Sequence, residues 1–434
     1  MNNNSEIYNS PEYKRSRQAY TFECAFEHFV ALLVSGVFLA KLLGDIGMDD
    51  ALIGIISSFI SLSFLFQLFS VFVGQRISNT KRFVTLFHSL SQVFFMSLYL
   101  IPFLPFEYKH KEILVIVCIL AAYFGNYFVT SMIYQWGNSH VHPNHRARFS
   151  ATKEMISLAF GIIVSLAAGY VIDSFELGGN LKGGFLFIAV SIFIFSACDF
   201  TCLMLIKNRI KSPEEKKQIA PMREVFKNII GNKNYLTVIV LQILWSVSAY
   251  TTTGFMGTYV INPHELAFSV GAAQLITILG HGSRCLISRP FGRFSDKHSY
   301  AKGIELGLIL AAVSFSINIF TTPATRFFYV GYMIIHSVCY AGIGQNMFNI
   351  TYNFVDSKYI AEAMAIKNCI GGICGFGASI LASKLLKHIQ DSGNTFLGMN
   401  VYGQQVLSAI SLLILIAAII FTKLVIEKQK TMVQ

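Results

Sequence analysis

The sequence predicts an all-α membrane protein with twelve transmembrane helices in two pseudo-symmetric six-helix bundles. The first observation is a repeated pattern of about twelve apolar segments of roughly twenty residues each. This length suits helices that cross about 30 Å of hydrocarbon at 1.5 Å per residue. The second is a composition of 54% hydrophobic and 13% charged residues, which is too apolar for a water-soluble globule. The third is an internal repeat, in which the two halves of the chain share residues at matching positions.

The individual spans follow from hydropathy and from the polar joints that separate them. We expect them at 20–43, 50–73, 83–106, 113–136, 151–173, 184–206, 235–261, 267–289, 303–320, 327–350, 365–388 and 403–426. A charged segment divides them six and six. The predicted organisation is a tail at 1–19, a bundle at 20–206, a linker at 207–234, a second bundle at 235–426 and a tail at 427–434.

The basic residues set the predicted orientation. Of the 34 Lys and Arg residues, about 26 fall on the side that holds both termini and the linker, and cationic loops stay in the cytoplasm during insertion. Both termini are therefore expected in the cytoplasm, in a plasma membrane (cell inner membrane) protein surrounded by lipid. The net charge of +11 does not indicate nucleic-acid binding, because the charges occupy separate loops instead of one face.

The internal repeat is clearest after the fourth and tenth spans. Lys153 and Lys367 occupy matching positions, and each is followed by a helix rich in small residues, at 161–169 and at 371–377. Such residues let helix backbones approach closely in lipid. A parallel repeat of two six-helix bundles, here with an offset of about 215 residues, is typical of transporters that rock around a solute site near the midplane.

The segment after the eighth span reads RPFGRFSDK at 289–297 and is followed by Lys302. It resembles the signature loop of the major facilitator superfamily, in which an Asp stands four residues after a Gly and is followed by bases. In this sequence the matching residues are Gly292, Arg293, Asp296 and Lys297. The Gly is expected to permit a tight exit from the helix, while the Asp is expected to cap a helix and to attract facing cations.

The equivalent segment after the second span keeps Gly74, Arg76, Lys81 and Arg82, but Ser78 stands where the acid is expected. The resemblance extends over nearly the whole chain through its topology. It implies a secondary active transporter in which Gly74, Arg82 and the four residues of the later segment gate the cytoplasmic side.

Ionisable side chains inside spans cost roughly 2.5–3.5 kcal/mol at the bilayer centre, so each needs a function or a partner. Glu23 and Glu27 lie one turn apart on one face of the first span, and His28 follows. A Glu beside a His can exchange a proton near neutral pH, so Glu27, His28 and Asp199 are the proton-coupling candidates. Glu23 is expected at the cytoplasmic boundary, paired with loop bases.

Polar and aromatic side chains within the other spans are candidates for solute binding, because amides and aromatic faces suit a polyhydroxylated solute. They are His88, Gln92, Tyr123, Asn126, Tyr127, Gln242, Trp245, His281, Arg284, His336, Gln345, Asn346 and Asn349. Two have a plain alternative: Arg284 is close enough to the expected cytoplasmic end to snorkel, and His336 suits packing. Lys153 and Lys367 are expected to anchor the inner surface.

Several functions are excluded. No glycine-rich phosphate loop followed by Lys-Ser or Lys-Thr is present, so ATP is not the expected energy source. His140, His142 and His145 imitate metal-ligand spacing, but they lie in a basic loop without a nearby carboxylate or thiolate, so no metal site is expected. No catalytic constellation appears, and we expect neither an enzyme nor a cofactor.

The sequence therefore predicts a secondary active transporter that moves a small polar organic solute, with sugar or glycoside-like solutes favoured, by proton-coupled alternating access. Two alternatives remain open. Efflux of drugs or other hydrophobic compounds would suit the 39 Phe residues, although the fifth span lacks the Gly-Pro element usual in drug antiporters of the superfamily. A non-transporting membrane sensor with the same fold is the other.

Overall fold

The computed structural model describes residues 8, 10–74, 77, 79–142, 146–208, 222–356 and 359–429. The chain divides into two compact units, an amino-terminal unit of Met1–Gly47 and Phe66–Ile219, and a carboxy-terminal unit of Met48–Leu65 and Ala220–Gln434. Most of the expected linker, together with Arg76, Ser78, Pro143 and His145, lies outside the described residues.

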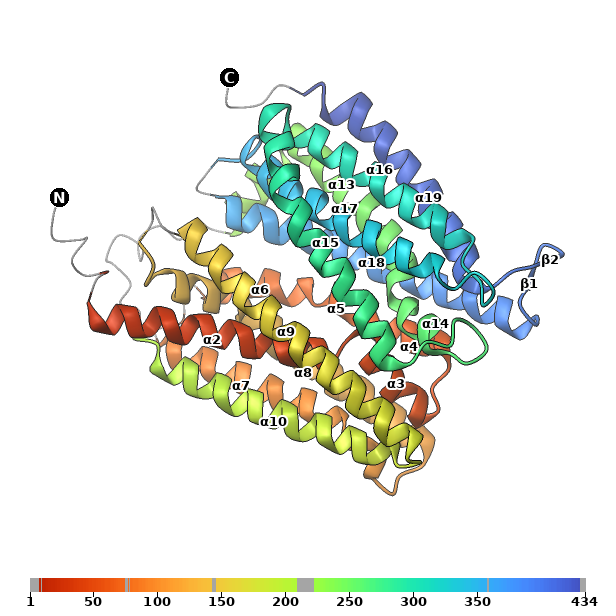
Figure 1. Ribbon diagram of the computed structural model, residues 1–434. Coiled ribbons are helices and arrows are strands. Elements are labelled where there is room, and N and C mark those ends of the chain that lie inside the picture. Colours follow the sequence, from red (N-terminus) through yellow and green to blue (C-terminus); the bar gives the residue numbers. More distant parts are fainter. Residues whose placement is uncertain are drawn as a thin grey trace. The chain divides into compact units, whose positions relative to one another are not determined.

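The amino-terminal unit is a bundle of long helices (Figure 1). They are α2 (Pro11–Leu33), α3 (Gly36–Ile46), α7 (Thr80–Leu98), α8 (Tyr108–Asn138), α9 (Arg146–Leu177) and α10 (Leu181–Leu205), with most of α6 (Phe64–Gly74) and the short 3₁₀ turn η1 (Ile101–Phe103). Helix α2 begins where its sequence allows: the Ser10 side chain accepts a hydrogen bond from the Tyr13 N–H, Pro11 occupies the first turn and Glu12 faces the positive helix end.

The carboxy-terminal unit is also helical. Its helices are α4 (Asp50–Ser57), α5 (Phe59–Leu62), α12 (Met222–Ile230), α13 (Lys233–Thr252), η3 (Thr253–Phe255), α14 (Met256–Ile261), α15 (Val270–Lys297), α16 (Tyr300–Ile319), α17 (Phe328–Tyr352), α18 (Ile360–Asp391), α19 (Gly403–Phe421) and η5 (Thr422–Ile426). A small antiparallel hairpin of β1 (Thr395–Phe396) and β2 (Met399–Asn400) pairs Thr395 with Asn400.

Eight helices in the described part of the chain are long and apolar enough to cross a membrane, and a ninth is counted when α2 and α3, bent by 42°, are taken as one span. The three remaining expected spans fall on α7, α15 and α17, which carry more polar side chains. Every expected span thus falls on a helix or a broken helix. The chain is an all-α membrane protein, as the sequence predicts.

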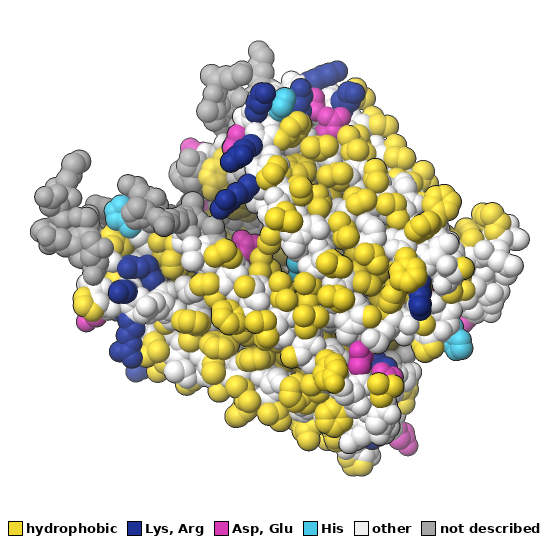
Figure 2. All heavy atoms as spheres, in the orientation of Figure 1, with side chains coloured by type: hydrophobic (Ala, Val, Ile, Leu, Met, Phe, Trp, Pro, Cys, Tyr) yellow, Lys and Arg dark blue, Asp and Glu magenta, His cyan; other side chains and the backbone are white. Residues whose placement is uncertain are grey.

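The surface of the molecule is apolar along the helices. Figure 2 shows hydrophobic side chains over the visible helices, while Lys and Arg side chains gather toward helix ends. Leu286, Leu381 and Leu413 are each more than 60% exposed. Soluble monomers rarely expose continuous apolar patches beyond a few hundred Å², so this surface is suited to lipid.

The helices differ from the expected spans most clearly in three places. The first helix begins at Pro11 instead of residue 20, because Ser10 and Pro11 start it early. The eighth continues to Lys297 instead of ending at 289. The second is broken into α4, α5 and α6, where the hydroxyls of Ser58 and Ser63 donate to carbonyl oxygens of the preceding turn, a local bond that bends helices.

Candidate functional site

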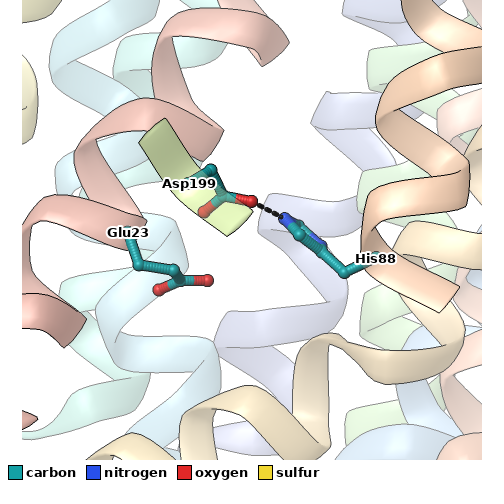
Figure 3. Close-up of side chains that lie close together, drawn as sticks. All are labelled: Glu23, His88 and Asp199. Carbon is teal, nitrogen blue, oxygen red and sulfur yellow. Dashed lines mark ion pairs between the residues drawn. The ribbon is translucent and has the colours of Figure 1, made fainter. Parts of the chain in front are cut away.

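Three ionisable side chains from three helices meet in the interior of the amino-terminal unit. Glu23 comes from α2, His88 from α7 and Asp199 from α10, and all three are at most 1% exposed. His88 Nε2 lies 2.8 Å from Asp199 Oδ2, and the Glu23 carboxylate points toward this pair (Figure 3). One ligand atom from each residue lies within 4.8 Å of the others. We call Glu23, His88 and Asp199 the acid–histidine cluster.

The helix positions explain why these residues meet. Because α2 begins at Pro11, Glu23 lies about 18 Å along the helix at 1.5 Å per residue, well inside the bundle. Helix α10 packs against both α2 and α7, which brings Asp199 between the other two side chains. Glu23 was expected near the cytoplasmic boundary because the first span was placed from residue 20, nine residues after the start of α2. The Ser10-Pro11-Glu12 start signal could have corrected that boundary.

Negative charge exceeds positive charge at the cluster. Glu27 lies one turn after Glu23 and within electrostatic range of both His88 and Asp199. Three carboxyl groups therefore surround one imidazole. Glu23 Oε1 and both Asp199 oxygens are buried without an aligned hydrogen-bond donor, so the contact of Asp199 with His88 is an ion pair more than a directed hydrogen bond. Buried carboxylates in this state need a cation.

A second cation lies at the edge of the cluster. Lys153 Nζ on α9 donates to Tyr20 Oη at 3.2 Å and to Cys24 Sγ at 3.1 Å, and it stands over the Tyr20 ring at 4.5 Å. The Cys24 thiol in turn donates to Glu23 Oε2 at 3.1 Å. Lys153 thus contacts side chains of its own unit, and a chain of polar contacts connects it to Glu23.

The other amino-terminal candidates are arranged around this centre. Gln92 Nε2 lies 3.2 Å from His88 Nε2, and Asn126 makes a side-chain hydrogen bond to Glu27. Tyr123 is buried and contacts the ring of Tyr127. The candidates Glu27, Asp199, His88, Gln92 and Asn126 therefore lie together or nearly so.

His28 lies elsewhere. A Cβ placed on Gly161 of α9 would lie 3.0 Å from His28 Cδ2, so the imidazole packs against that glycine. Neighbouring residues on a helix point in different directions, since faces recur every three or four residues. His88 from another helix lies within electrostatic range of Glu27, and the role of His28 in proton coupling stays a prediction.

In the carboxy-terminal unit the candidates form an aromatic row. The rings of Tyr332, His336 and Tyr340 follow one another at centroid distances of 5.1 and 5.2 Å, and Trp245 meets Tyr340 at 5.3 Å. His336 is buried and its Nδ1 lies 3.2 Å from Ser314 Oγ. His336 is therefore packed and hydrogen-bonded within the row.

The remaining carboxy-terminal candidates are dispersed. Gln242 Nε2 donates to Ser246 Oγ at 3.0 Å, and buried Asn346 donates to the Gly342 carbonyl at 2.7 Å. Gln345 is exposed, and Asn349 and His281 are half-buried. Arg284 lies in the middle of α15, because that helix extends to Lys297. Arg284 therefore lies thirteen residues before the helix end, and its expected snorkelling stays a prediction.

The gate segment differs in form from the expected loop. Gly292, Arg293, Asp296 and Lys297 belong to the last turns of α15. The cap of the next helix is Ser299, whose hydroxyl accepts the Lys302 N–H, so the expected capping role of Asp296 was wrong. A serine nearer the start of α16 satisfies its first amide groups.

In the other half, Gly74 ends α6. The Asn79 side chain accepts the Arg82 N–H at the start of α7, and Lys81 Nζ donates to the carbonyls of Met204 and Ile206 at the end of α10. A lysine at the negative end of a helix is favourable. The gating roles of Gly74 and Arg82 stay predictions.

The donor atoms of the acid–histidine cluster, one imidazole nitrogen and two carboxylates, are of a kind that divalent transition metals accept. The histidines whose spacing imitates a metal site are not part of this cluster. His140 Nδ1 donates to the Trp136 carbonyl at 3.0 Å, the ring of His142 packs edge-on against Tyr8, and His145 lies outside the described residues.

Long apolar helices around a buried set of ionisable groups define a polytopic membrane transporter. The profile of the Major Facilitator Superfamily matches residues 24–379, and the chain belongs to this superfamily. It is a membrane transporter of the major facilitator type, and not an enzyme. No curated protein sequence matches the chain.

Solved structures share the fold at low sequence identity. The nucleoside transporter NupG is 12% identical with a TM-score of 0.69, over 97% of this chain and 100% of that one. A bacterial homologue of the human lysosomal transporter Spinster, inward-facing and unoccupied, is 13% identical with a TM-score of 0.68 over 95% and 96%. An auto-inhibited POT family peptide transporter is 11% identical with a TM-score of 0.69 over 97% and 98%.

Proposed function

We propose that this protein couples the movement of a small polar organic solute to protons by alternating access, in the plasma membrane with both termini in the cytoplasm. The observation that carries this proposal is the acid–histidine cluster together with Glu27. Ionisable groups inside a membrane are costly, and those that persist there serve ion or proton pathways.

The charge balance of the cluster favours protons as the coupling ion. Glu23, Glu27 and Asp199 contribute three acidic groups, and His88 compensates one of them. Bound protons neutralise the carboxylates that His88 does not compensate. When His88 separates from Asp199, one proton is released. A helix movement that alters the 2.8 Å contact therefore changes proton affinity, which links proton exchange to conformation.

The solute class rests on the polar and aromatic side chains that lie within the helices of both units. Amides such as Gln92 and Gln242 and the rings of Tyr123 and Trp245 suit a solute with both polar groups and a flat face. The similar structures include a nucleoside transporter and a peptide transporter, both of which carry polar organic solutes. These likenesses support a polar solute over a hydrophobic drug, and the absence of a phosphate loop supports a proton gradient over ATP.

The proposal is tested in proteoliposomes with Glu27→Gln and Asp199→Asn. Both variants mimic the protonated form permanently, so we expect solute exchange to persist and uphill accumulation driven by a pH gradient to be lost. Glu176→Gln is the matched control, because Glu176 is exposed and pairs with Lys41 away from the cluster.

Two results would contradict proton coupling at this site. One is accumulation by both variants under an imposed pH gradient. The other is wild-type accumulation driven by a Mn²⁺ gradient at constant pH, which would assign the same three ligands to a divalent cation.

A further inference from the structure

We propose that Arg284 of the carboxy-terminal unit binds an anionic group of the transported solute, so that the solute is a small organic carboxylate. This inference rests on the proposed function, and it narrows the solute class. Arg284 lies fourteen residues after Val270 and thirteen before Lys297 in α15. At 1.5 Å per residue it is about 20 Å from either helix end, and it falls inside the expected eighth span at 267–289.

Arg284 is on the packed face of its helix. Ala273, Gly280 and Phe291 are buried, and they lie eleven residues before, four before and seven after it, which is the spacing of a single helix face. The lipid-type stripe of α15 is formed by Leu275, Leu279 and Leu286, which are 50%, 47% and 78% exposed. Leu286 is two residues from Arg284, so the two side chains leave opposite sides of the helix.

Arg284 nevertheless remains exposed. A guanidinium that faces away from the lipid stripe and is still reachable can meet water or a dissolved ion. Since a charge at the bilayer centre costs roughly 2.5–3.5 kcal/mol on insertion scales, such groups line water-filled pathways or pair with an opposite charge. Among the described residues, no carboxylate forms an ion pair with Arg284. The position therefore has a cation whose partner must come from elsewhere.

Close contacts between α15 and α17 flank Arg284 on both sides along the helix. Helix α15 touches α17 one turn before it, where a Cβ on Gly280 would collide with Ser337, and two turns after it, where a Cβ on Gly342 would collide with the Phe291 ring. Between these contacts, Arg284 lies within electrostatic range of Cys339 and Tyr340. The adjacent groups are thus a thiol and a phenol, neither of which is an anion at neutral pH.

These surroundings select the chemistry of the ligand. A planar guanidinium with five donors pairs with a carboxylate through two parallel hydrogen bonds. The ring of Tyr340 lies within electrostatic range of Arg284, and the ring of Trp245 lies 5.3 Å from that of Tyr340. Both rings offer flat apolar surface to the body of the same molecule. His281, one turn before Arg284 on a neighbouring face, is also within electrostatic range. One cation and two rings fit a monocarboxylate with a flat body better than a phosphate dianion.

The test compares acids with their own amides on the purified full-length protein. Thermal stability is measured with benzoate and benzamide, nicotinate and nicotinamide, lactate and lactamide, and inorganic phosphate, for wild type, Arg284→Gln, Arg284→Lys and the control Arg289→Gln. Arg289 is exposed on the same helix, three residues after Leu286. We expect at least one acid to stabilise wild type and the control at concentrations where its amide does not.

In Arg284→Gln that response should be lost, since a bidentate charged contact of about 1.5–3 kcal/mol corresponds to a roughly tenfold or greater loss of affinity. Arg284→Lys should retain part of it, which separates charge loss from misfolding. The proposal is overturned if no acid stabilises wild type more than its amide, if phosphate alone does, or if Arg284→Gln responds as wild type. Phosphatidylglycerol should stabilise all four proteins equally, and a selective loss in Arg284→Gln would instead assign the site to a lipid headgroup.

These results are independent of proton coupling. Binding at equilibrium needs no gradient, so loss of coupling in Glu27→Gln with intact acid binding would contradict the proposed function alone. Coupled uptake of a neutral solute by Arg284→Gln at the wild-type rate would contradict the carboxylate site alone.

Discussion

The two units carry opposite excess charge inside their helices. The amino-terminal unit buries Glu23 and Asp199 with His88 and holds half-buried Glu27 nearby, whereas the carboxy-terminal unit holds Arg284 in mid-helix without a carboxylate partner among the described residues. One unit therefore needs a cation and the other an anion. The uptake of a proton with a monocarboxylate that we propose would satisfy both and would transfer no net charge, so the membrane potential, worth about 2.3 kcal/mol per charge at 100 mV, would not oppose it.

The same contrast appears at two lysines in matching sequence positions. Lys153 approaches the acid–histidine cluster through Cys24. Lys367 of α18 is 3% exposed, and its Nζ donates to the Met347 carbonyl at 2.6 Å. Neither is the surface anchor that the sequence suggested, because each helix begins several residues before its lysine. The two halves thus share a lysine at matching positions, and the groups around each lysine determine its contacts.

The largest expected effect comes from removing His88, the cation within the acid–histidine cluster. His88→Leu leaves buried carboxylates without their partner, and breaking a buried pair in this way costs about 3–5 kcal/mol. We expect a corresponding loss of unfolding free energy in detergent. Arg284→Leu should be nearly neutral, because it leaves no described carboxylate unpaired.

The double variant His88→Leu with Asp199→Asn serves as the control. It removes one of the carboxylates left without a partner and should recover part of the lost unfolding free energy. Equal destabilisation by His88→Leu and Arg284→Leu would refute the contrast between the units.

The second effect concerns Asp296 near the end of α15. An acid in the last helical turns faces the negative end of the helix dipole, at a cost of about 0.3–1 kcal/mol. We expect Asp296→Asn to fold at least as well as wild type, yet to transport roughly tenfold more slowly, because a charge-assisted contact of about 1.5–3 kcal/mol is lost from one conformation. Asp391→Asn, at the last residue of α18, is the control. Transport at the wild-type rate would remove Asp296 from the gate.

The sequence alone predicted the helical membrane fold well, because runs of twenty apolar residues have few other stable structures. It also placed Asp199, His88 and Glu27 among the functional candidates, since an ionisable residue within an apolar run is visible in one dimension. It did not predict that His88 would lie beside Asp199, because that contact depends on how α2, α7 and α10 pack. The mid-helix position of Arg284 was missed because basic residues at 289–297 resemble a loop while continuing the helix.

The smallest effect tests an acid of the carboxy-terminal unit outside the spans. Glu265, in the connection between α14 and α15, is 6% exposed. Burial and, to a smaller extent, the nearby Asp50 carboxylate raise the pKa of its carboxyl to about 8, while a hydrogen bond from Gln390 acts in the opposite direction.

A carboxyl that binds its proton more tightly in the folded state than at its ordinary pKa of 4.5 contributes stability that is complete below that value. This contribution disappears as pH rises through about 8. Wild type should therefore melt several degrees lower at pH 9 than at pH 5, at about 2–4 °C per kcal/mol. Glu265→Gln keeps a neutral side chain at every pH and should flatten this dependence, whereas Glu107→Gln, at an exposed position, should leave it unchanged. An unaltered slope in Glu265→Gln would show that the carboxylate is solvated in the folded protein. The carboxy-terminal unit would then tolerate a negative charge at Glu265, outside the spans.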